Sequence, residues 1–361
     1  MGSFQKFVSA FVFIGFGAAA YAAPTSVMQT EDQMIDAAFA DALARGSEAA
    51  LDQNLRIVAR TLASQDSVAT ANNPSLVNEL YRGILEKVDA EHWTQFETHH
   101  FSIVKSLFRS QGLTTDNKGN WWFSSRSSLL RTTSKTGSEH VFKLFPLPKE
   151  LVALKDNHIG DIDYADGKIY APVEDGSKYL HPYIVVYDAH KLTVDHFVSV
   201  PHDLQPDGVP WVAVDAANQR VYSSQYSNTT KINVYDMATL KPLGQIAMSR
   251  MINSIQGGKV LNGSLYMTAD SEDGKSHSIY KMNLTTGMVL TVAQMPKDLV
   301  EVEGLSFAQT AKGLELNALG VVVIKNPISK KIRRTEICGF HLDQMSRRDQ
   351  FRQTLLNMAE Y

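Results

Sequence analysis

The chain has 361 residues, of which 44% are hydrophobic and 20% are charged, and its formal net charge at pH 7 is −3. This composition is typical of a globular protein with a substantial core, and it excludes collagen-like and largely disordered chains. The nearly balanced charge also gives no electrostatic reason to expect nucleic acid as a partner.

Residues 1–23 have the pattern of a signal peptide. Lys6 is the only charged side chain before an apolar stretch, residues 7–20, which ends in Ala20-Tyr21-Ala22. A basic start, a short apolar core and a small-x-small end are typical of a secretory signal. The apolar stretch is shorter than the roughly 20 residues that span a bilayer. We therefore predict a secreted or periplasmic protein with no transmembrane segment after cleavage, and an uncleaved N-terminal anchor is the alternative.

Residues 30–95 are predicted to be helical. Three segments, near residues 34–43, 51–62 and 76–88, carry apolar residues at helical spacing. Thr30 precedes two acidic residues, which is typical of a helix start. Because each helix has one apolar face, the three must pack on one another or on another part of the chain.

From residue 101 to 342 the sequence consists of short β-rich segments that repeat about every 50 residues. A turn followed by a strand with tyrosine recurs at 167–170, 219–222 and 263–266, and a Val-Tyr-Asp strand recurs at 186–188 and 234–236. Units of this length with four short strands are typical of propeller blades. We predict a mainly β fold, a propeller of about five four-stranded blades, followed by a helix over 345–359.

The last repeat lacks a regular outer strand. Residues 101–104 are apolar and lie just before the first blade, so we expect them to supply that strand from the other end of the chain. Such a closure would remove the free edges of the sheets. The single cysteine, Cys338, lies in an apolar strand and is predicted to be a small buried side chain.

Alignment of the repeats places polar residues near the start of each inner strand, where a propeller's central channel opens. The strongest candidates for a ligand-binding site there are His158, Asp161, Asn253 and Glu303, with Gln111 at the corresponding position of the first blade. Glu303, Asp161 and Asn253 also offer the oxygen ligands that Ca²⁺ prefers. The alternative is that these side chains satisfy channel waters and backbone groups.

Motifs of hydrolases and nucleotide-binding proteins do not occur in the sequence: there is no GxSxG, HExxH or P-loop. Whether the protein is an enzyme therefore stays open at this point.

The strand-turn-Tyr-Asp repeat resembles the YncE-like, NHL-like and gluconolactonase-like propellers over about two-thirds of the chain. In gluconolactonase-like propellers a channel metal is held by a Glu followed by Gly and by several Asn or Asp. Glu303-Gly304, Asn253 and Asp161 are similar in kind, although that family has six blades.

Three functions are compatible with these observations. The first is an exported propeller that binds a small molecule or a protein partner at the channel face without turnover. The second is a calcium-dependent lactonase or esterase, as the resemblance implies, with Glu303 and Asp161 holding the ion and His158 near the reacting group. The third is a scaffold whose N-terminal helices make the main contact.

Overall fold

The computed structural model describes residues 29–270, 276–324 and 332–359. The predicted signal peptide, residues 1–23, lies outside the described residues. The chain divides into two compact units, residues 1–77 and 78–361. None of the helices in the described ranges is both long and apolar enough to cross a membrane.

The N-terminal unit is helical, as predicted. It contains α2 (Glu31–Ala44), α3 (Glu48–Asp66), α4 (Val68–Ala71) and the start of α5 (Pro74–Val88). Thr30 and Gln33 form a capping box at α2, because each side chain accepts a hydrogen bond from the other residue's backbone N–H. The helices α2 and α3 contact each other, and Asn54 Nδ2 donates to the Ala38 carbonyl at 3.2 Å.

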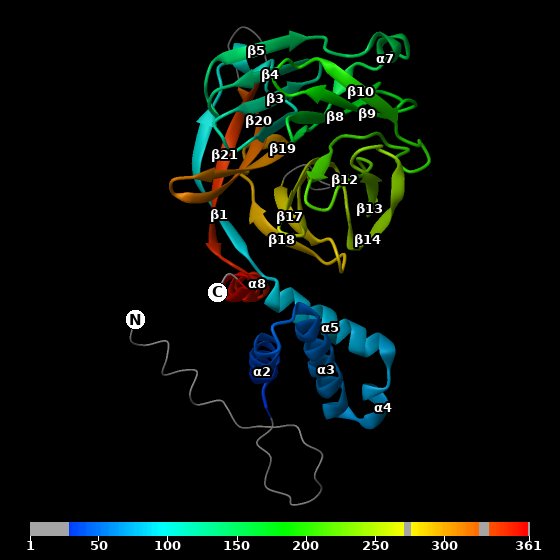
Figure 1. Cartoon of the computed structure of the whole chain (residues 1–361), viewed down its shortest axis with the longest axis vertical. Helices are drawn as coiled ribbons and strands as arrows, with labels where there is room; N and C mark the ends of the chain where they lie inside the picture. The colour runs from blue at the N-terminus through cyan, green and yellow to red at the C-terminus, as the bar shows by residue number, and fades with distance from the viewer. Residues whose placement is uncertain (1–28, 271–275, 325–331, 360–361) are drawn as a thin grey trace, which may run out of the picture. The chain divides into compact units, whose positions relative to one another are not determined.

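The second unit is a propeller of five antiparallel blades around a common centre (Figure 1). The first blade contains β2 (Gly112–Thr115), β3 (Trp121–Ser125), β4 (Ser128–Thr132) and β5 (Glu139–Leu144). The second has a broken inner strand and contains β6 (His158–Ile159), β7 (Asp163–Ala165), β8 (Lys168–Glu174), β9 (Tyr183–Asp188) and β10 (Val194–Ser199). The third contains β11 (Ala213–Asp215), β12 (Arg220–Ser223), β13 (Thr229–Asp236) and β14 (Pro242–Ile252), and the fourth β15 (Ile255–Leu261), β16 (Ser264–Asp270), β17 (His277–Asn283) and β18 (Val289–Gln294). This confirms the predicted fold class.

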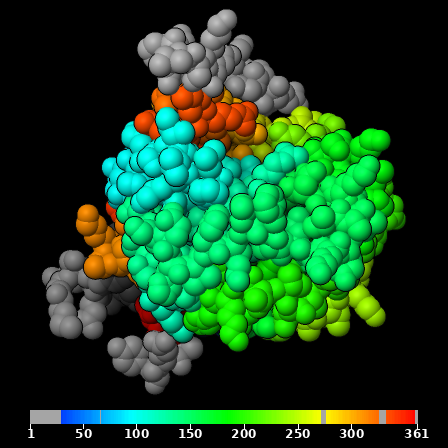
Figure 2. Space-filling model, turned by 90° about the horizontal axis from the view of Figure 1, so that it is seen from above, coloured from blue at the N-terminus to red at the C-terminus, as the bar shows by residue number. Residues whose placement is uncertain are grey.

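The fifth blade closes the ring with a strand from the N-terminal side of the propeller. It contains β19 (Leu299–Thr310), β20 (Gly313–Ile324), β21 (Ile332–Gln344) and, as the outer strand, β1 (His92–His100). Figure 2 shows the cyan residues of this region between the red-orange end of the chain and the green first blades.

A strand from the N-terminal side of the propeller closes the ring, as predicted, but the residues predicted to form that strand were wrong. Residues 101–104 are not the strand: Ile103–Ser106 is a short helix, α6, and the Ser102 hydroxyl caps it by accepting from the Lys105 N–H. The helical prediction for 30–95 also extends too far, since α5 ends at Val88 and β1 begins at His92. The outer strand was missed because all its residues but Trp93 are exposed or only partly buried, so it carries a weak apolar signal.

The core consists of apolar clusters within and between adjacent blades. Trp211 of the third blade, for example, packs with Ile255 and Met267 of the fourth. Cys338 is fully buried in the fifth blade, and burial raises the pKa of its thiol, as expected for a small core residue.

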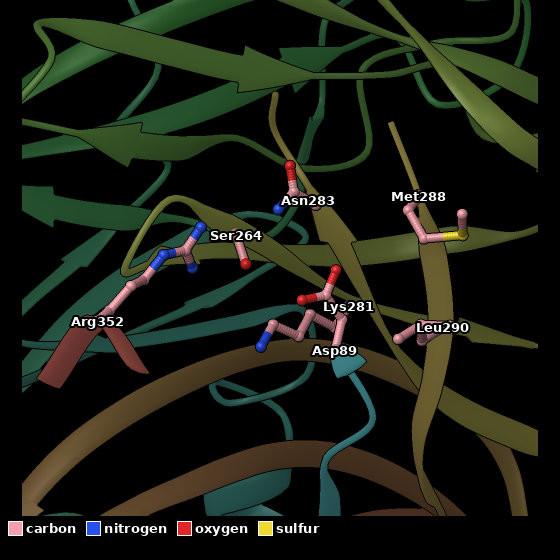
Figure 3. Close-up of a pocket in the computed structure, with 7 residues that line it drawn as sticks. All are labelled: Asp89, Ser264, Lys281, Asn283, Met288, Leu290 and Arg352. Carbon is pink, nitrogen blue, oxygen red and sulfur yellow. The ribbon is translucent and has the colours of Figure 1, made fainter. Parts of the chain in front are cut away.

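The C-terminal helix α8 (Arg347–Ala359) is joined to the propeller by buried charges. Lys281 Nζ lies 2.7 Å from Glu91 Oε2, just before β1, and 2.9 Å from Asp349 Oδ2 of α8. Burial works to lower the pKa of Lys281, but the two carboxylates outweigh it and raise the pKa. Side chains around the small pocket beside this cluster include Asp89, Lys281 and Arg352 (Figure 3).

Candidate functional site

The centre of the propeller is occupied by an ion pair between Asp161 and Lys259. Both side chains are almost fully buried, and Lys259 Nζ lies 3.2 Å from Asp161 Oδ2. The same carboxylate accepts the backbone N–H groups of Leu113 (3.2 Å, to Oδ1) and Gly258 (3.1 Å, to Oδ2). Lys259 Nζ also donates to the carbonyls of Ile162 (2.8 Å) and Gly258 (3.0 Å). The predicted site residue Asp161 therefore already has a cationic partner and two backbone donors.

Asp163 adds a second contact to β2 and extends this network to β11 of the third blade. Its Oδ1 accepts from the Thr114 hydroxyl (3.0 Å) and lies 3.7 Å from Lys259 Nζ, and its Oδ2 accepts the Val214 N–H (2.8 Å). Through these contacts, the two aspartates and Lys259 connect the inner strands of the first four blades. Burial raises the pKa of Asp161 to about 7, against the opposing effect of Lys259 and the N–H donors.

The inner strands approach each other so closely that glycine is required at several points. A Cβ on Gly304 would lie 2.2 Å from Asp161 Oδ1, and one on Gly112 would lie 2.6 Å from Asp161 Cα. Protein atoms therefore occupy the centre of the channel. Any ligand of this region must therefore bind at an end of the inner strands.

A second hydrogen-bonded chain lies near the starts of these strands and contains two of the predicted site residues. Gln111 Nε2 donates to Glu303 Oε1 at 2.9 Å, and Gln111 Oε1 accepts from His158 Nε2. His158 Nδ1 lies 3.0 Å from Glu174 Oε1, and Glu174 Oε2 accepts the Val209 N–H at 2.6 Å. We call Glu174, His158, Gln111 and Glu303 the mouth chain. Its members come from three blades.

The orientation of the mouth chain follows from one backbone carbonyl. Gln111 Nε2 lies 2.7 Å from the Ser110 carbonyl, which can only accept a hydrogen bond, so the amide nitrogen must be on that side. The amide oxygen then faces His158 Nε2, while Glu174 faces the other ring nitrogen. Donation from both ring nitrogens would satisfy both contacts, and in that state the ring forms an ion pair with Glu174.

Glu303 lies at the far end of the mouth chain in an acidic environment. Burial raises its pKa well above the usual range, and the carboxylates of Glu301 and Asp270 raise it further. Its environment therefore favours the protonated form of Glu303 more than solvent would. A neutral acid here avoids the repulsion that an ionised one would experience.

The fourth predicted residue, Asn253, lies just before β15. Its side-chain oxygen accepts the backbone N–H of Asn228, so this contact connects the third and fourth blades. The structure thus joins His158 and Glu303 through Gln111, places Asp161 at the centre with Lys259, and places Asn253 at a blade boundary.

This donor set does not fit calcium. The Asp161 oxygens are held by an ammonium group and two N–H donors, and burial and neighbouring carboxylates raise the pKa of Glu303, which disfavours its ionised form. Within the described ranges, no three His, Cys, Asp or Glu side chains are grouped so that they could hold a metal ion. The sequence-based idea of a calcium site therefore gains no support from the geometry of these residues.

Sequence reasoning missed Lys259, Glu174 and a third group, Asp156. Asp156 is 3% exposed, and neither carboxylate oxygen has a hydrogen-bond partner among the described residues. Burial, with the nearby carboxylates of Asp175 and Glu174, raises its pKa to about 7. The available signal for Lys259 was a lysine directly after two glycines in an inner strand.

Comparisons with known proteins find distant structural neighbours. No protein-family model matches the chain, and no curated protein matches it. Among solved structures, an exo-1,5-α-L-arabinanase from a bovine ruminal metagenomic library has a TM-score of 0.46 at 10% identity, over 69% of this chain and 99% of that one. A gluconolactonase from Xanthomonas campestris has a TM-score of 0.40 at 13% identity, over 61% of this chain and 68% of that one.

A hydrazine synthase from Kuenenia stuttgartiensis has a TM-score of 0.38 at 10% identity, over 61% of this chain, and the chain covers 58% of that protein's length. At these identities the likeness concerns the fold alone. The five antiparallel blades themselves show the predicted propeller fold.

Proposed function

We propose that the propeller binds a small polar ligand, or a polar loop of a protein partner, at the mouth chain without turning it over. The observation that carries this proposal is the continuous polar chain Glu174–His158–Gln111–Glu303, which is held by three blades above a filled centre. The His158 side chain is 18% exposed, so a ligand can reach its edge. Fixed polar groups at the end of a rigid scaffold are typical of binding sites.

We propose that the ligand is not turned over because the ionisable side chains at the centre and in the mouth chain are paired with one another. Asp161 and Lys259 neutralise each other in the buried centre, and His158 is paired with Glu174. Neither arrangement leaves an activated nucleophile or a free general base next to the exposed edge. The interpretation of residues 1–23 as a signal peptide belongs to the same proposal, and the ligand would then be met outside the cytoplasm.

A thermal-shift panel of small polar metabolites tests the proposal. We expect at least one compound to raise the Tm of the wild type, and His158→Ala to abolish that rise. His202→Ala removes an exposed imidazole outside the mouth chain, so it should leave the rise intact. NMR of the recovered compound should show no chemical change. A rise that survives in His158→Ala, or conversion of the compound to a product, would contradict the proposal.

The hydrolase alternative needs a metal on Glu303, Asp161 and Asn253, and the same melting assay tests it. A bound metal stabilises a fold by about 2.7 kcal/mol when its free concentration is 100 times Kd. Because the oxygens of Asp161 are occupied and the raised pKa of Glu303 disfavours its ionised form, we expect neither calcium nor EDTA to change the Tm. A rise with calcium that Glu303→Gln removes would instead favour the metal-dependent hydrolase.

A further inference from the structure

A polar pocket on the third blade lies outside the mouth chain. Its volume is about 180 Å³, and residues of β13, β14 and two adjoining loops line it. At roughly 30 Å³ for each water molecule, this is room for about six waters, so the pocket suits a small ligand. The lining side chains used in the argument are Gln225, Lys231, Asn233 and Gln245.

The wall of this pocket is fixed by a chain of amides anchored in the core. Asn233 is 2% exposed, and its Nδ2 donates to the Leu204 carbonyl at 3.2 Å. The other end of the Asn233 amide, Oδ1, therefore points away from the Leu204 carbonyl. It accepts a hydrogen bond from Gln245 Nε2 at 2.7 Å. Because Leu204 offers only an acceptor, both amides have a defined orientation. Gln245 is left with its Oε1 and a second N–H for a ligand.

A cation lies next to this wall. Lys231 is two residues before Asn233 on β13, so the two side chains lie on the same face of the strand. Lys231 is exposed, and within the described residues its ammonium group has no ion-pair or hydrogen-bond partner. None of the described residues that line the pocket is acidic. The pocket therefore combines one positive charge with amide donors and acceptors of fixed orientation.

We propose that this pocket binds a small hydroxylated carboxylate, such as a sugar acid. The carboxylate pairs with Lys231, and the hydroxyl groups bond to the amides of Gln245 and Gln225. A hydroxyl group both donates and accepts, which matches an amide wall that offers both kinds of atom. A charge-assisted bond from the lysine is about twice as strong as a neutral one, so the carboxylate supplies the selectivity.

Glucuronate and glucose form a suitable probe pair, because they share the hydroxyl pattern of the ring and differ in the carboxylate. Saturation-transfer NMR and calorimetric titration of the full chain should show glucuronate binding at least tenfold more tightly than glucose. Lys231→Met should weaken glucuronate binding at least tenfold. Lys241→Met removes an exposed lysine in the turn between the same two strands, so it should change Kd less than twofold.

Two further measurements distinguish binding in this pocket from binding at the mouth chain and from unselective attraction of anions. His158→Ala should bind glucuronate as the wild type does, because His158 does not line the pocket; a loss would place binding at the mouth chain and overturn the inference. Gln245→Ala should weaken glucuronate more than acetate. Equal binding of acetate and glucuronate, equal binding of glucose, or unchanged binding by Lys231→Met would each overturn it.

Discussion

Asp156 is a buried carboxylate with no hydrogen-bond partner on either oxygen among the described residues. It lies between α7 (Lys149–Ala153) and His158, and its neighbours Glu174 and Asp175 are also acidic. Asp175 differs from it in having four backbone N–H donors, from Ser177 to Leu180, which stabilise its charge. Two aspartates that lie close together in space thus prefer opposite protonation states, because only one of them has donors.

Asp156 makes the stability of the fold depend on pH. Its pKa is about 7 in the folded chain and close to 3.8 when exposed, so the folded state holds the proton more tightly. Its contribution to stability is complete below about pH 4 and is lost as the pH rises through 7, by up to about 1.4 kcal/mol for each pH unit. In Asp156→Asn, urea unfolding between pH 5 and 8 should show a shallower decline than in the wild type.

The control for this measurement is Asp203→Asn, which alters an exposed carboxylate and should keep the wild-type decline. Other buried acids, among them Asp270 and Glu303, titrate in the same direction and remain in both variants. The comparison of the two variants therefore isolates Asp156. An Asp156→Asn variant with the full wild-type slope would show that the carboxylate is ionised throughout.

At the scale of elements, the closing strand β1 does most to complete the ring. Eight of its residues pair with β21, and Trp93 is 2% exposed between Tyr266 and Phe307, with ring centroids 6.4 and 5.8 Å away. Beyond the strand, Arg109 is fully buried, pairs with Glu139 at 2.8 Å and stacks on Phe101. The chain from the strand to the first blade is thus packed along its length.

Two shortened chains measure what β1 contributes. One begins at Asp89 and keeps the strand, and the other begins at Ser102 and lacks it; both lack the N-terminal helices. We expect the second to be less stable by at least about 3 kcal/mol, the cost of losing a large buried aromatic side chain, in addition to its lost ladder hydrogen bonds. Equal midpoints in urea unfolding would mean that β1 is not needed for closure.

The sequence was informative where a feature recurs and uninformative where it occurs once. The blades could be predicted because the turn-Tyr and Val-Tyr-Asp segments repeat, and each repeat supports the others. The closing strand has no equivalent in the chain's own repeats at that position, and its polar, half-exposed residues resemble a loop. For the same reason the repeats located Gln111, His158 and Glu303 but not Lys259, whose partner Asp161 lies 98 residues away in the sequence.

At the scale of the whole molecule, the five blades are held together at the rim and at the centre. At the rim, β1 joins the two ends of the propeller. At the centre, Asp161 and Lys259 connect the second and fourth blades directly, while Leu113 and Val214 bring in the first and third through the two aspartates. A buried charge pair of this kind contributes mainly by satisfying both partners, because removal of one leaves the other desolvated and unpaired.

Lys259→Met tests this role of the centre. The variant leaves Asp161 without the cation that lowers its pKa, so the buried acid must either carry an unpaired charge or take up a proton, and at pH 8 we expect a loss of about 3–5 kcal/mol in the free energy of unfolding. Adding Asp161→Asn removes the unpaired acid. The double variant should therefore lose less free energy of unfolding than the two single variants together. The exposed Lys241→Met should lose almost nothing. The coupling energy of the two charges is measured by urea unfolding of the wild type, the two single variants and the double variant. If the losses of the single variants add to that of the double variant within about 0.5 kcal/mol, the two charges act independently.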